Sequence, residues 1–154
     1  MGLKRAKVQQ GYDLIGDVHG CGHSLERLLD KMGYQYLHGC YRHPTRKVIF
    51  VGDIVDRGPR IREALHVVKD MVDGGQAEIV LGNHEYNAMC YCTEGRANSG
   101  QRYLREHNAR NHRLIRDTLE QFDSYRTEWQ EFLNWFHHIP LFIEKEHFRI
   151  VHAC

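Results

Sequence analysis

The first two thirds of the 154-residue sequence alternate between short apolar runs and stretches with helical spacing of apolar residues. Three runs, at 12–16, 47–52 and 77–82, are short and largely apolar, and each ends in a glycine. Between them, apolar side chains recur every three or four residues over 25–32 and 61–72, which predicts two amphipathic helices. The order strand–helix–strand–helix–strand predicts an α/β fold with a βαβαβ core and a mainly parallel sheet.

A polar, arginine-rich stretch follows the third predicted strand. A short helix is expected over 84–90, and apolar residues resume a helical face over 114–122. Between these helices, the stretch from about 93 to 113 shows little hydrophobic periodicity, which is typical of a loop. We therefore predict a cap or loop-helix insertion over 93–126, within a single domain that extends over 1–154.

The last part of the chain is predicted to contain one more helix and two strands. Thr127 and Gln130 resemble a capping box at the start of this helix. Pro140 ends the helix, and the runs 141–144 and 148–153 then predict two strands joined by a turn. The sequence has no internal repeat and no Pro- or Ser-rich linker.

Composition and charge argue against several classes of function. With 42% hydrophobic residues the chain can form an ordinary core, but no run approaches the ~20 apolar residues of a transmembrane helix. A formal net charge of +1 gives no electrostatic reason to expect nucleic acid or a membrane as a partner. The basic N-terminus lacks an apolar signal core, and the five cysteines lack zinc or disulfide spacing. These features predict a cytoplasmic protein with reduced thiols.

Metal-ligand and catalytic residue types follow each predicted strand of the core and the last strand of the chain. The carboxyl ends of parallel strands meet at one edge of a sheet, with neighbouring strands ~4.8 Å apart, so side chains placed there converge. The four motifs are GDVHG at 16–20, GDIVDRGP at 52–59, GNHE at 82–85 and VHAC at 151–154.

These strand ends provide three oxygen ligands and two imidazoles, from Asp17, His19, Asp53, Asn83 and His152. This mixture suits manganese, iron or zinc better than a thiolate zinc site or an all-oxygen calcium site. Asp53 is the natural bridge, since one carboxylate can bind two ions ~3.5–4 Å apart. Because crowded carboxylates are costly to desolvate without cations, the pattern predicts a site for two metals.

Each of these residues has a simpler interpretation when it is taken alone. Asp17 could be a turn residue, Asn83 a cap of the following helix, and His152 a frayed terminal residue. Independent turn residues have no reason to fall at four successive strand ends, so their joint occurrence favours the metal site. The arginine-rich stretch 102–116 is interpreted as a solvated helix, with a substrate-facing cap as the alternative.

The motifs GDVHG, GDIVDRG and GNHE, in this order and followed by VHA, resemble those of the calcineurin-type metallophosphoesterases. Within that family they are most similar to the phosphoprotein phosphatases and the bacterial diadenosine-tetraphosphate hydrolases. The likeness runs from Asp17 to His152, which is nearly the whole chain. It implies a layered metallophosphoesterase sandwich that contains the βαβαβ core.

The resemblance also implies which residues hold metal. Asp17, His19 and Asp53 would hold one divalent ion, and Asp53, Asn83 and His152 would hold the other. Manganese is the expected metal, with iron or zinc as alternatives. A hydroxide that bridges the ions would attack phosphorus in line, without a phosphoenzyme intermediate.

Three further roles follow from the same resemblance. His84 would protonate the leaving oxygen, and Asp56 would orient its imidazole. Arg57 would bind phosphate oxygens through its planar fork, and Asn83 would contact phosphate as well as metal.

Three functions remain open at this point. The first is a phosphatase acting on phosphoproteins or small phosphoesters, and the second is a dinucleoside-polyphosphate hydrolase. The third is a non-catalytic fragment that binds metal, because the family pattern continues beyond His152 with another histidine and another arginine. We therefore expect a truncated chain with an incomplete second sheet, while the oligomeric state is left open.

Overall fold

The computed structural model describes residues 10–96 and 100–153. The basic N-terminal stretch discussed above falls mostly on 1–9, which lie outside the described residues. The same holds for 97–99, within the predicted insertion, and for Cys154.

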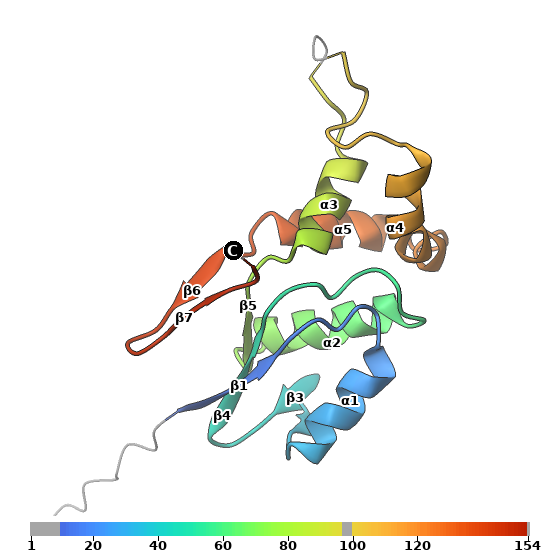
Figure 1. Ribbon diagram of the computed structural model, residues 1–154. Coiled ribbons are helices and arrows are strands. Elements are labelled where there is room, and N and C mark those ends of the chain that lie inside the picture. Colours follow the sequence, from blue (N-terminus) through green and yellow to red (C-terminus); the bar gives the residue numbers. More distant parts are fainter. Residues whose placement is uncertain (1–9, 97–99, 154) are drawn as a thin grey trace, which may run out of the picture.

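A parallel three-stranded sheet forms the centre of the fold (Figure 1). Its strands are β1 (Gly11–Ile15), β4 (Arg46–Phe50) and β5 (Ala77–Ile79), in the order β1-β4-β5. Helix α1 (Gly22–Lys31) follows β1, and helix α2 (Ile61–Asp73) connects β4 to β5. The predicted α/β fold with a βαβαβ core is therefore confirmed.

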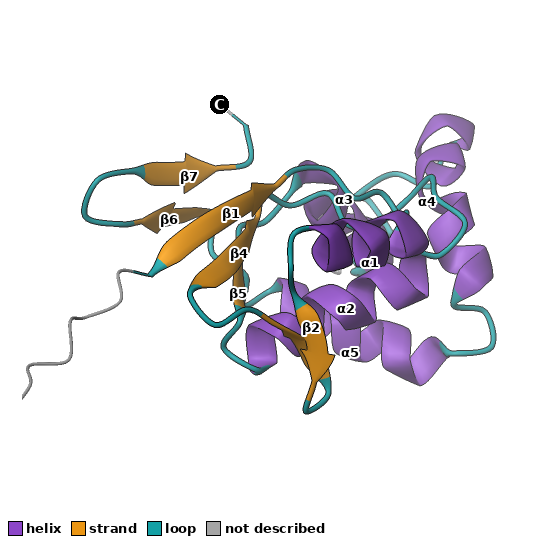
Figure 2. Ribbon diagram, turned by 90° about the horizontal axis from the view of Figure 1, so that it is seen from below, coloured by secondary structure: helices purple, strands orange, loops and turns teal. Residues whose placement is uncertain are grey.

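Both faces of this sheet are covered, which explains why the central strand is apolar without alternation. Val48 and Phe50 belong to the larger apolar cluster, which the helices complete, whereas Ile49 belongs to a smaller cluster on the opposite face. An antiparallel hairpin of β6 (Phe142–Glu144) and β7 (Arg149–Val151) covers that opposite face (Figure 2). The other buried members of the smaller cluster are Val80, Ile143 and Ile150.

Three further helices lie beyond the carboxyl ends of the strands (Figure 1). They are α3 (Asn83–Cys92), α4 (Ala109–Gln121) and α5 (Arg126–Phe136). Helix α3 packs against α5, and α4 contacts α2. Helix α4 begins five residues earlier than the periodicity predicted, because Asn108 caps it by accepting the Asn111 backbone N–H at 2.9 Å. Among the helices of the described residues, none is long and apolar enough to cross a membrane.

The structure contains a hairpin that the periodicity did not predict. It consists of β2 (Gln35–Leu37) and β3 (Cys40–Arg42), which are paired antiparallel. His38 and Gly39 join them with φ values of 53° and 85°, as expected of a two-residue turn of the primed type. Three-residue strands are too short to show a reliable alternation.

The predicted capping box at Thr127 and Gln130 is wrong. Helix α5 starts at Arg126, so Thr127 lies inside its first turn, and the N-cap residue Tyr125 makes no side-chain cap. This turn is tied to α2 instead, because Glu128 accepts hydrogen bonds from Arg62 at 2.5 and 3.0 Å. The hydrogen bond from Arg62 holds the pKa of Glu128 below its ordinary value.

Candidate metal centre and catalytic site

The loops that follow β1 and β4 are joined through their backbones. The N–H groups of Val18 and His19 both donate to the Asp53 carbonyl, at 3.0 and 2.9 Å. The Gly20 N–H donates to the Ile54 carbonyl at 2.7 Å. These bonds fix the GDVHG loop against the GDIVDRGP loop, so that the polar side chains of the two loops face a common space.

The backbone at the candidate site adopts a strained conformation. His19, Asp53, Asp56 and Arg57 have positive φ values of 42°, 55°, 69° and 69°. Within the described part of the chain, the only other non-glycine residue of this kind is His38 in the β2–β3 turn. Such conformations cost about 1–2 kcal/mol each and persist only where the surroundings impose them. Four of the predicted site residues are thus held in place by the fold.

Two glycines of the motifs are required by close backbone approach. A Cβ atom on Gly58 would lie 2.2 Å from the His19 carbonyl oxygen. On Gly82, it would lie 2.2 Å from the Asp53 backbone nitrogen. Both distances are shorter than any van der Waals contact, so only glycine lets the three loops pack this tightly.

The five predicted metal ligands lie in one cluster centred on Asp53. His19 Nε2 is 3.7 Å from Asp17 Oδ2 and 3.8 Å from Asp53 Oδ2. His152 Nε2 is 3.4 Å from the same Asp53 Oδ2 and 2.9 Å from Asn83 Oδ1. Asp53 Oδ2 therefore faces both imidazoles, which is the position that a bridging carboxylate oxygen requires.

The hydrogen bonds of the two histidines show that this cluster fits metal ions. The Nδ1–H of His19 donates to the Val55 carbonyl at 2.9 Å, and that of His152 donates to the Val51 carbonyl at 2.6 Å. A carbonyl can only accept, so in the neutral rings the lone pair of Nε2 points at the carboxylates. Lone pairs that face carboxylate oxygens repel them unless a cation lies between, and backbone carbonyls commonly orient metal-binding histidines in this way.

A second, buried group adjoins the cluster through His84. The His84 Nδ1–H donates to Asp56 Oδ2 at 2.6 Å, and the backbone N–H of His84 donates to Asp53 Oδ1 at 2.9 Å. Asp56 also accepts from the Thr118 hydroxyl at 2.5 Å. On the other side of the ring, His84 Nε2 lies 3.4 Å from Arg57 Nη2. The hydrogen bond to Asp56 raises the pKa of His84, whereas burial lowers it. All eight predicted site residues are thus linked in one set of contacts.

Thr118 and Glu85 are positioning residues that the sequence patterns did not reveal. Thr118, which is fully buried, lies on α4 and supports Asp56. The buried Glu85 carboxylate accepts backbone N–H groups from the loop after β4 and from Gly82. Glu85 stands in the GNHE motif, but nothing in the motif shows which backbone groups it binds.

Replacing Glu85 with glutamine is expected to lower the free energy of unfolding by about 3 kcal/mol. Oε1 accepts from Ile54 and Val55, and Oε2 accepts from Asp53 and Gly82. A glutamine NH₂ would face one of these donor pairs, and each unsatisfied buried donor costs about 1–3 kcal/mol. Urea denaturation measures the change.

The matched control is Glu131→Gln, because Glu131 is exposed on α5. It should change the unfolding free energy by less than about 0.5 kcal/mol. Equal effects of the two substitutions would show that the backbone contacts of Glu85 contribute nothing specific.

Comparison with known sequences finds similar proteins over about half of this chain. Bis(5'-nucleosyl)-tetraphosphatase PrpE (asymmetrical) from Halalkalibacterium halodurans is 49% identical over 74 residues, and its namesake from Oceanobacillus iheyensis is 48% identical over 73. Each match covers 47% of this chain but only 30% and 29% of the respective relative. The matched part thus spans less than a third of the length of these curated relatives.

Comparison with known structures agrees on the fold. A metallophosphoesterase from Sphaerobacter thermophilus superimposes with a TM-score of 0.52 at 22% identity, covering 92% of this chain and 46% of that one. A protein serine/threonine phosphatase from Saccharomyces cerevisiae gives a TM-score of 0.55 at 20% identity, covering 88% and 35%. The sequence model of the calcineurin-like phosphoesterases matches residues 12–153, which include every residue of the candidate site. By this match the chain belongs to the calcineurin-like phosphoesterase family.

Proposed function

We propose that this chain carries the site of a hydrolase that cleaves phosphoester bonds with two divalent metal ions. Asp17, His19 and Asp53 would hold one ion, and Asp53, Asn83 and His152 would hold the other. The observation that carries the proposal is the shared orientation of both imidazoles toward Asp53 Oδ2, with their Nε2 lone pairs directed at oxygen ligands. Manganese is the proposed metal, with iron or zinc as alternatives.

Two cations bound there would acidify a water molecule and neutralise charge on the phosphoryl oxygens. In the proposed reaction, the water molecule releases one proton to the solvent, its oxygen forms a new bond to phosphorus, and the bond from phosphorus to the leaving oxygen breaks. His84 gives the proton on Nε2 to the leaving oxygen, and Asp56 holds the ring through Nδ1–H. Arg57 and Asn83 bind oxygens of the phosphoryl group that is attacked.

Two substrate classes fit this proposal. The first is a phosphorylated protein or a small phosphoester, which needs no more than the attacked phosphoryl group and a leaving oxygen. The second is a dinucleoside polyphosphate. This class is favoured by the matched stretch of 74 residues, which is 49% identical to a relative named bis(5'-nucleosyl)-tetraphosphatase.

Metal content and turnover, measured on one sample, test the proposal. The chain is loaded with manganese, passed through gel filtration, and assayed for metal per chain and for hydrolysis of p-nitrophenyl phosphate. Two ions per chain together with turnover are expected. One ion without turnover would favour the alternative of a non-catalytic metal-binding fragment, and no bound metal would contradict both interpretations. Rates on a phosphopeptide and on diadenosine tetraphosphate then separate the two substrate classes.

A further inference from the structure

The loop after α3 folds back onto that helix and places an arginine beside it. The Arg105 backbone N–H donates to the Cys90 carbonyl at 2.9 Å. Its Nη1 donates to the side-chain oxygen of Asn87 at 2.6 Å. The backbone N–H of Leu104 also donates to the Thr93 carbonyl, at 2.9 Å. These contacts hold the half-buried Arg105 guanidinium against the middle of α3, at Asn87.

This guanidinium lies on the same side of α3 as His84. Asn87 follows His84 by three residues, so the two side chains project from one helix face, with their Cα atoms about 4.5 Å apart along the axis. A narrow cavity of about 10 Å³ is lined by Arg105 and Asn87 together with His84 and Asp56. That volume holds about one water molecule. Arg105 and His84 therefore line the same cavity, with Asn87 between them on α3.

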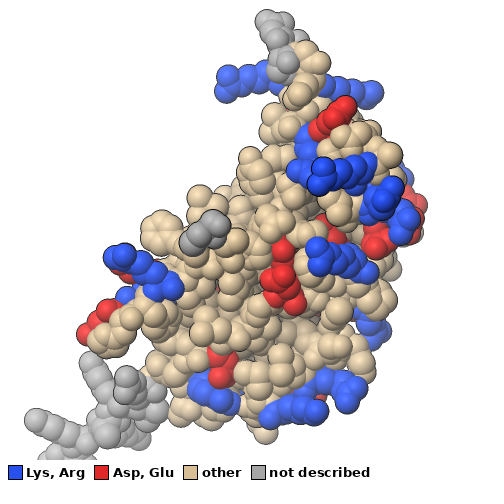
Figure 3. Space-filling model, viewed as in Figure 1, with Lys and Arg blue, Asp and Glu red and all other residues tan. Residues whose placement is uncertain are grey.

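Among the described residues Arg105 forms no ion pair, although the Asp56 carboxylate lines the same cavity. Its hydrogen-bonding partner there is the neutral amide of Asn87, whereas Arg62 pairs with Glu128 and Arg116 with Asp117. The surrounding stretch, 94–116, contains six arginines against two glutamates. Figure 3 shows basic side chains gathered over the loop after α3 and over α4, and these are arginines because the sequence has no lysine between Lys69 and Lys145. A half-buried cation in a basic surface is suited to bind an anionic group of a ligand.

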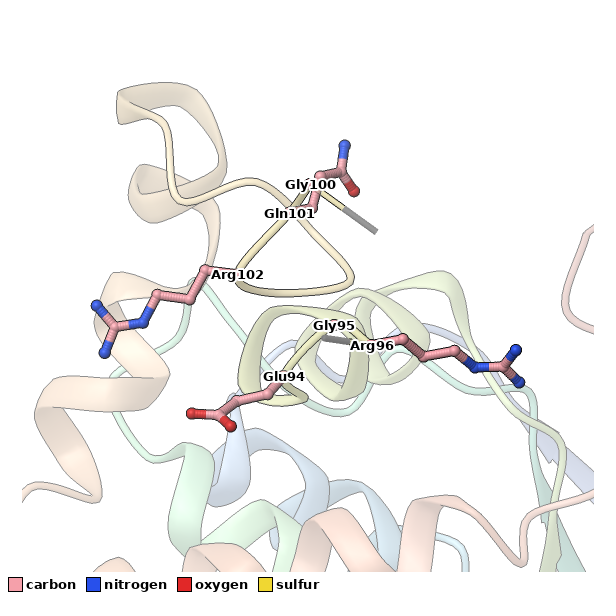
Figure 4. Close-up of a pocket in the computed structure, with 6 residues that line it drawn as sticks. All are labelled: Glu94, Gly95, Arg96, Gly100, Gln101 and Arg102. Atoms are coloured by element: carbon pink, nitrogen blue, oxygen red, sulfur yellow. The ribbon is translucent and has the colours of Figure 1, made fainter. Parts of the chain in front are cut away.

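A second hollow, larger than the cavity beside His84, is less suited to bind an anionic group. It has a volume of about 430 Å³ and is formed by the two arms of the same loop (Figure 4). The side chains of Arg96 and Arg102 point away from each other there, to opposite sides of the loop. None of its lining residues belongs to the candidate site. The two arginines do not converge on one point, so we assign this hollow no ligand.

The position of Arg105 indicates which part of a substrate it would contact. In the proposed function, on which this inference rests, His84 protonates the leaving oxygen, so the departing group lies on the His84 side. Arg57 approaches His84 Nε2 from the loop after β4 and serves the attacked phosphoryl group. Arg105, on the loop after α3, borders the region beyond His84.

We propose that Arg105 is a substrate-binding residue that contacts a phosphate in the departing group. A phosphoanhydride, such as a nucleoside polyphosphate, has a phosphate in its departing group. A phosphomonoester with an alkyl or aryl leaving group has none. Arg105 therefore increases the affinity of the site for nucleoside polyphosphates but not for phosphomonoesters.

Two matched nucleotides test this proposal by equilibrium binding. Attack on the terminal phosphorus of α,β-methylene-ADP, which resists hydrolysis, would expel an anionic group, whereas attack on AMP would expel neutral adenosine. Both affinities are measured calorimetrically at saturating manganese. Arg105→Gln is expected to weaken binding of α,β-methylene-ADP by about 10- to 100-fold, the effect of losing charge-assisted hydrogen bonds. It should leave AMP binding unchanged.

Two further variants make the result specific. Arg105→Lys keeps the charge but loses the planar fork, so it should show an intermediate loss. Arg102→Gln removes an exposed arginine from the same loop and should change neither affinity. Thermal unfolding shows whether Arg105→Gln is folded, and Arg105→Lys serves in its place if it is not.

Equal losses for both nucleotides, no loss, or no binding of α,β-methylene-ADP by the unmodified chain would overturn the role of Arg105. The proposed hydrolase function is tested separately, by measuring hydrolysis of p-nitrophenyl phosphate. If that substrate is not hydrolysed but the Arg105-dependent difference is present, Arg105 binds phosphate and the hydrolase proposal is wrong.

Discussion

Substitution of Asp53 by asparagine is expected to reduce turnover by at least about 10³-fold, because in the proposed function two metal ions would stabilise the transition state by several kcal/mol. The substitution is nearly isosteric and removes the charge on Oδ2, which faces both His19 and His152. It should not strain the backbone, since Asp53 has a φ of 55° and asparagine tolerates the left-handed region well. The retained Oδ1 can still accept the His84 N–H.

The measurement pairs p-nitrophenyl phosphate turnover with metal content and circular dichroism. Native-like dichroism with at most one retained ion is expected for Asp53→Asn. The matched control is Asp123→Asn, because Asp123 is exposed and its ion pair within the described residues is with Arg126 at the surface. Should Asp53→Asn keep two ions and turn over within about tenfold of the unmodified chain, the dimetal mechanism would have to be abandoned.

Substitution of His84 by asparagine is expected to reduce turnover by about 10²- to 10³-fold on an alkyl phosphate, because a positioned general acid contributes about 10²- to 10⁴-fold. The loss should be much smaller on p-nitrophenyl phosphate, whose leaving group needs little protonation. Asp56 orients the ring but does not touch the leaving oxygen in the proposed reaction. The dependence on the leaving group therefore distinguishes proton donation from a structural role of His84.

Metal content should remain at the value of the unmodified chain, since His84 is not among the proposed ligands. His138→Asn is the control, because His138 is exposed and bonds the Asn134 carbonyl on the surface. A uniform loss on both substrates, or loss of an ion, would argue against the role of general acid. His84 lies near His19 and Asp53 in a group that could itself bind a cation, which makes the metal measurement necessary.

The sheet and its helices could be predicted because their signals are local. The run at 47–52 is buried on both faces, and amphipathic spacing over 61–72 marks the face that α2 turns toward the core. The β2–β3 hairpin was missed because all three residues of β2 are exposed. The start of α4 was missed because its first turn is mostly exposed and begins at a capping asparagine. In exposed segments, apolar residues need not recur at regular spacing, so hydrophobic periodicity says little about their secondary structure.

The cluster around Asp53 could also be predicted, for a geometric reason. Parallel strands bring their carboxyl ends to one edge, so the residues after β1, β4 and β5 must meet. The order of the strands was not needed for that inference. The positive φ values at His19, Asp53, Asp56 and Arg57 could not be predicted, because a positive φ is uncommon at any residue other than glycine, and even Asp and His adopt it in only a minority of cases.

The α/β fold and the set of residues that gather at the strand ends follow from the order and spacing of residues along the chain. The residues that support this set become apparent only when the packing of the elements is known. Thr118 reaches Asp56 across 62 positions of the chain, and Glu85 reaches the Asp53 loop across about 30. Arg105 comes beside His84 because its loop folds back onto α3. Such contacts arise from the packing of separate elements, and no local spacing of residues encodes which side chain will lie opposite which.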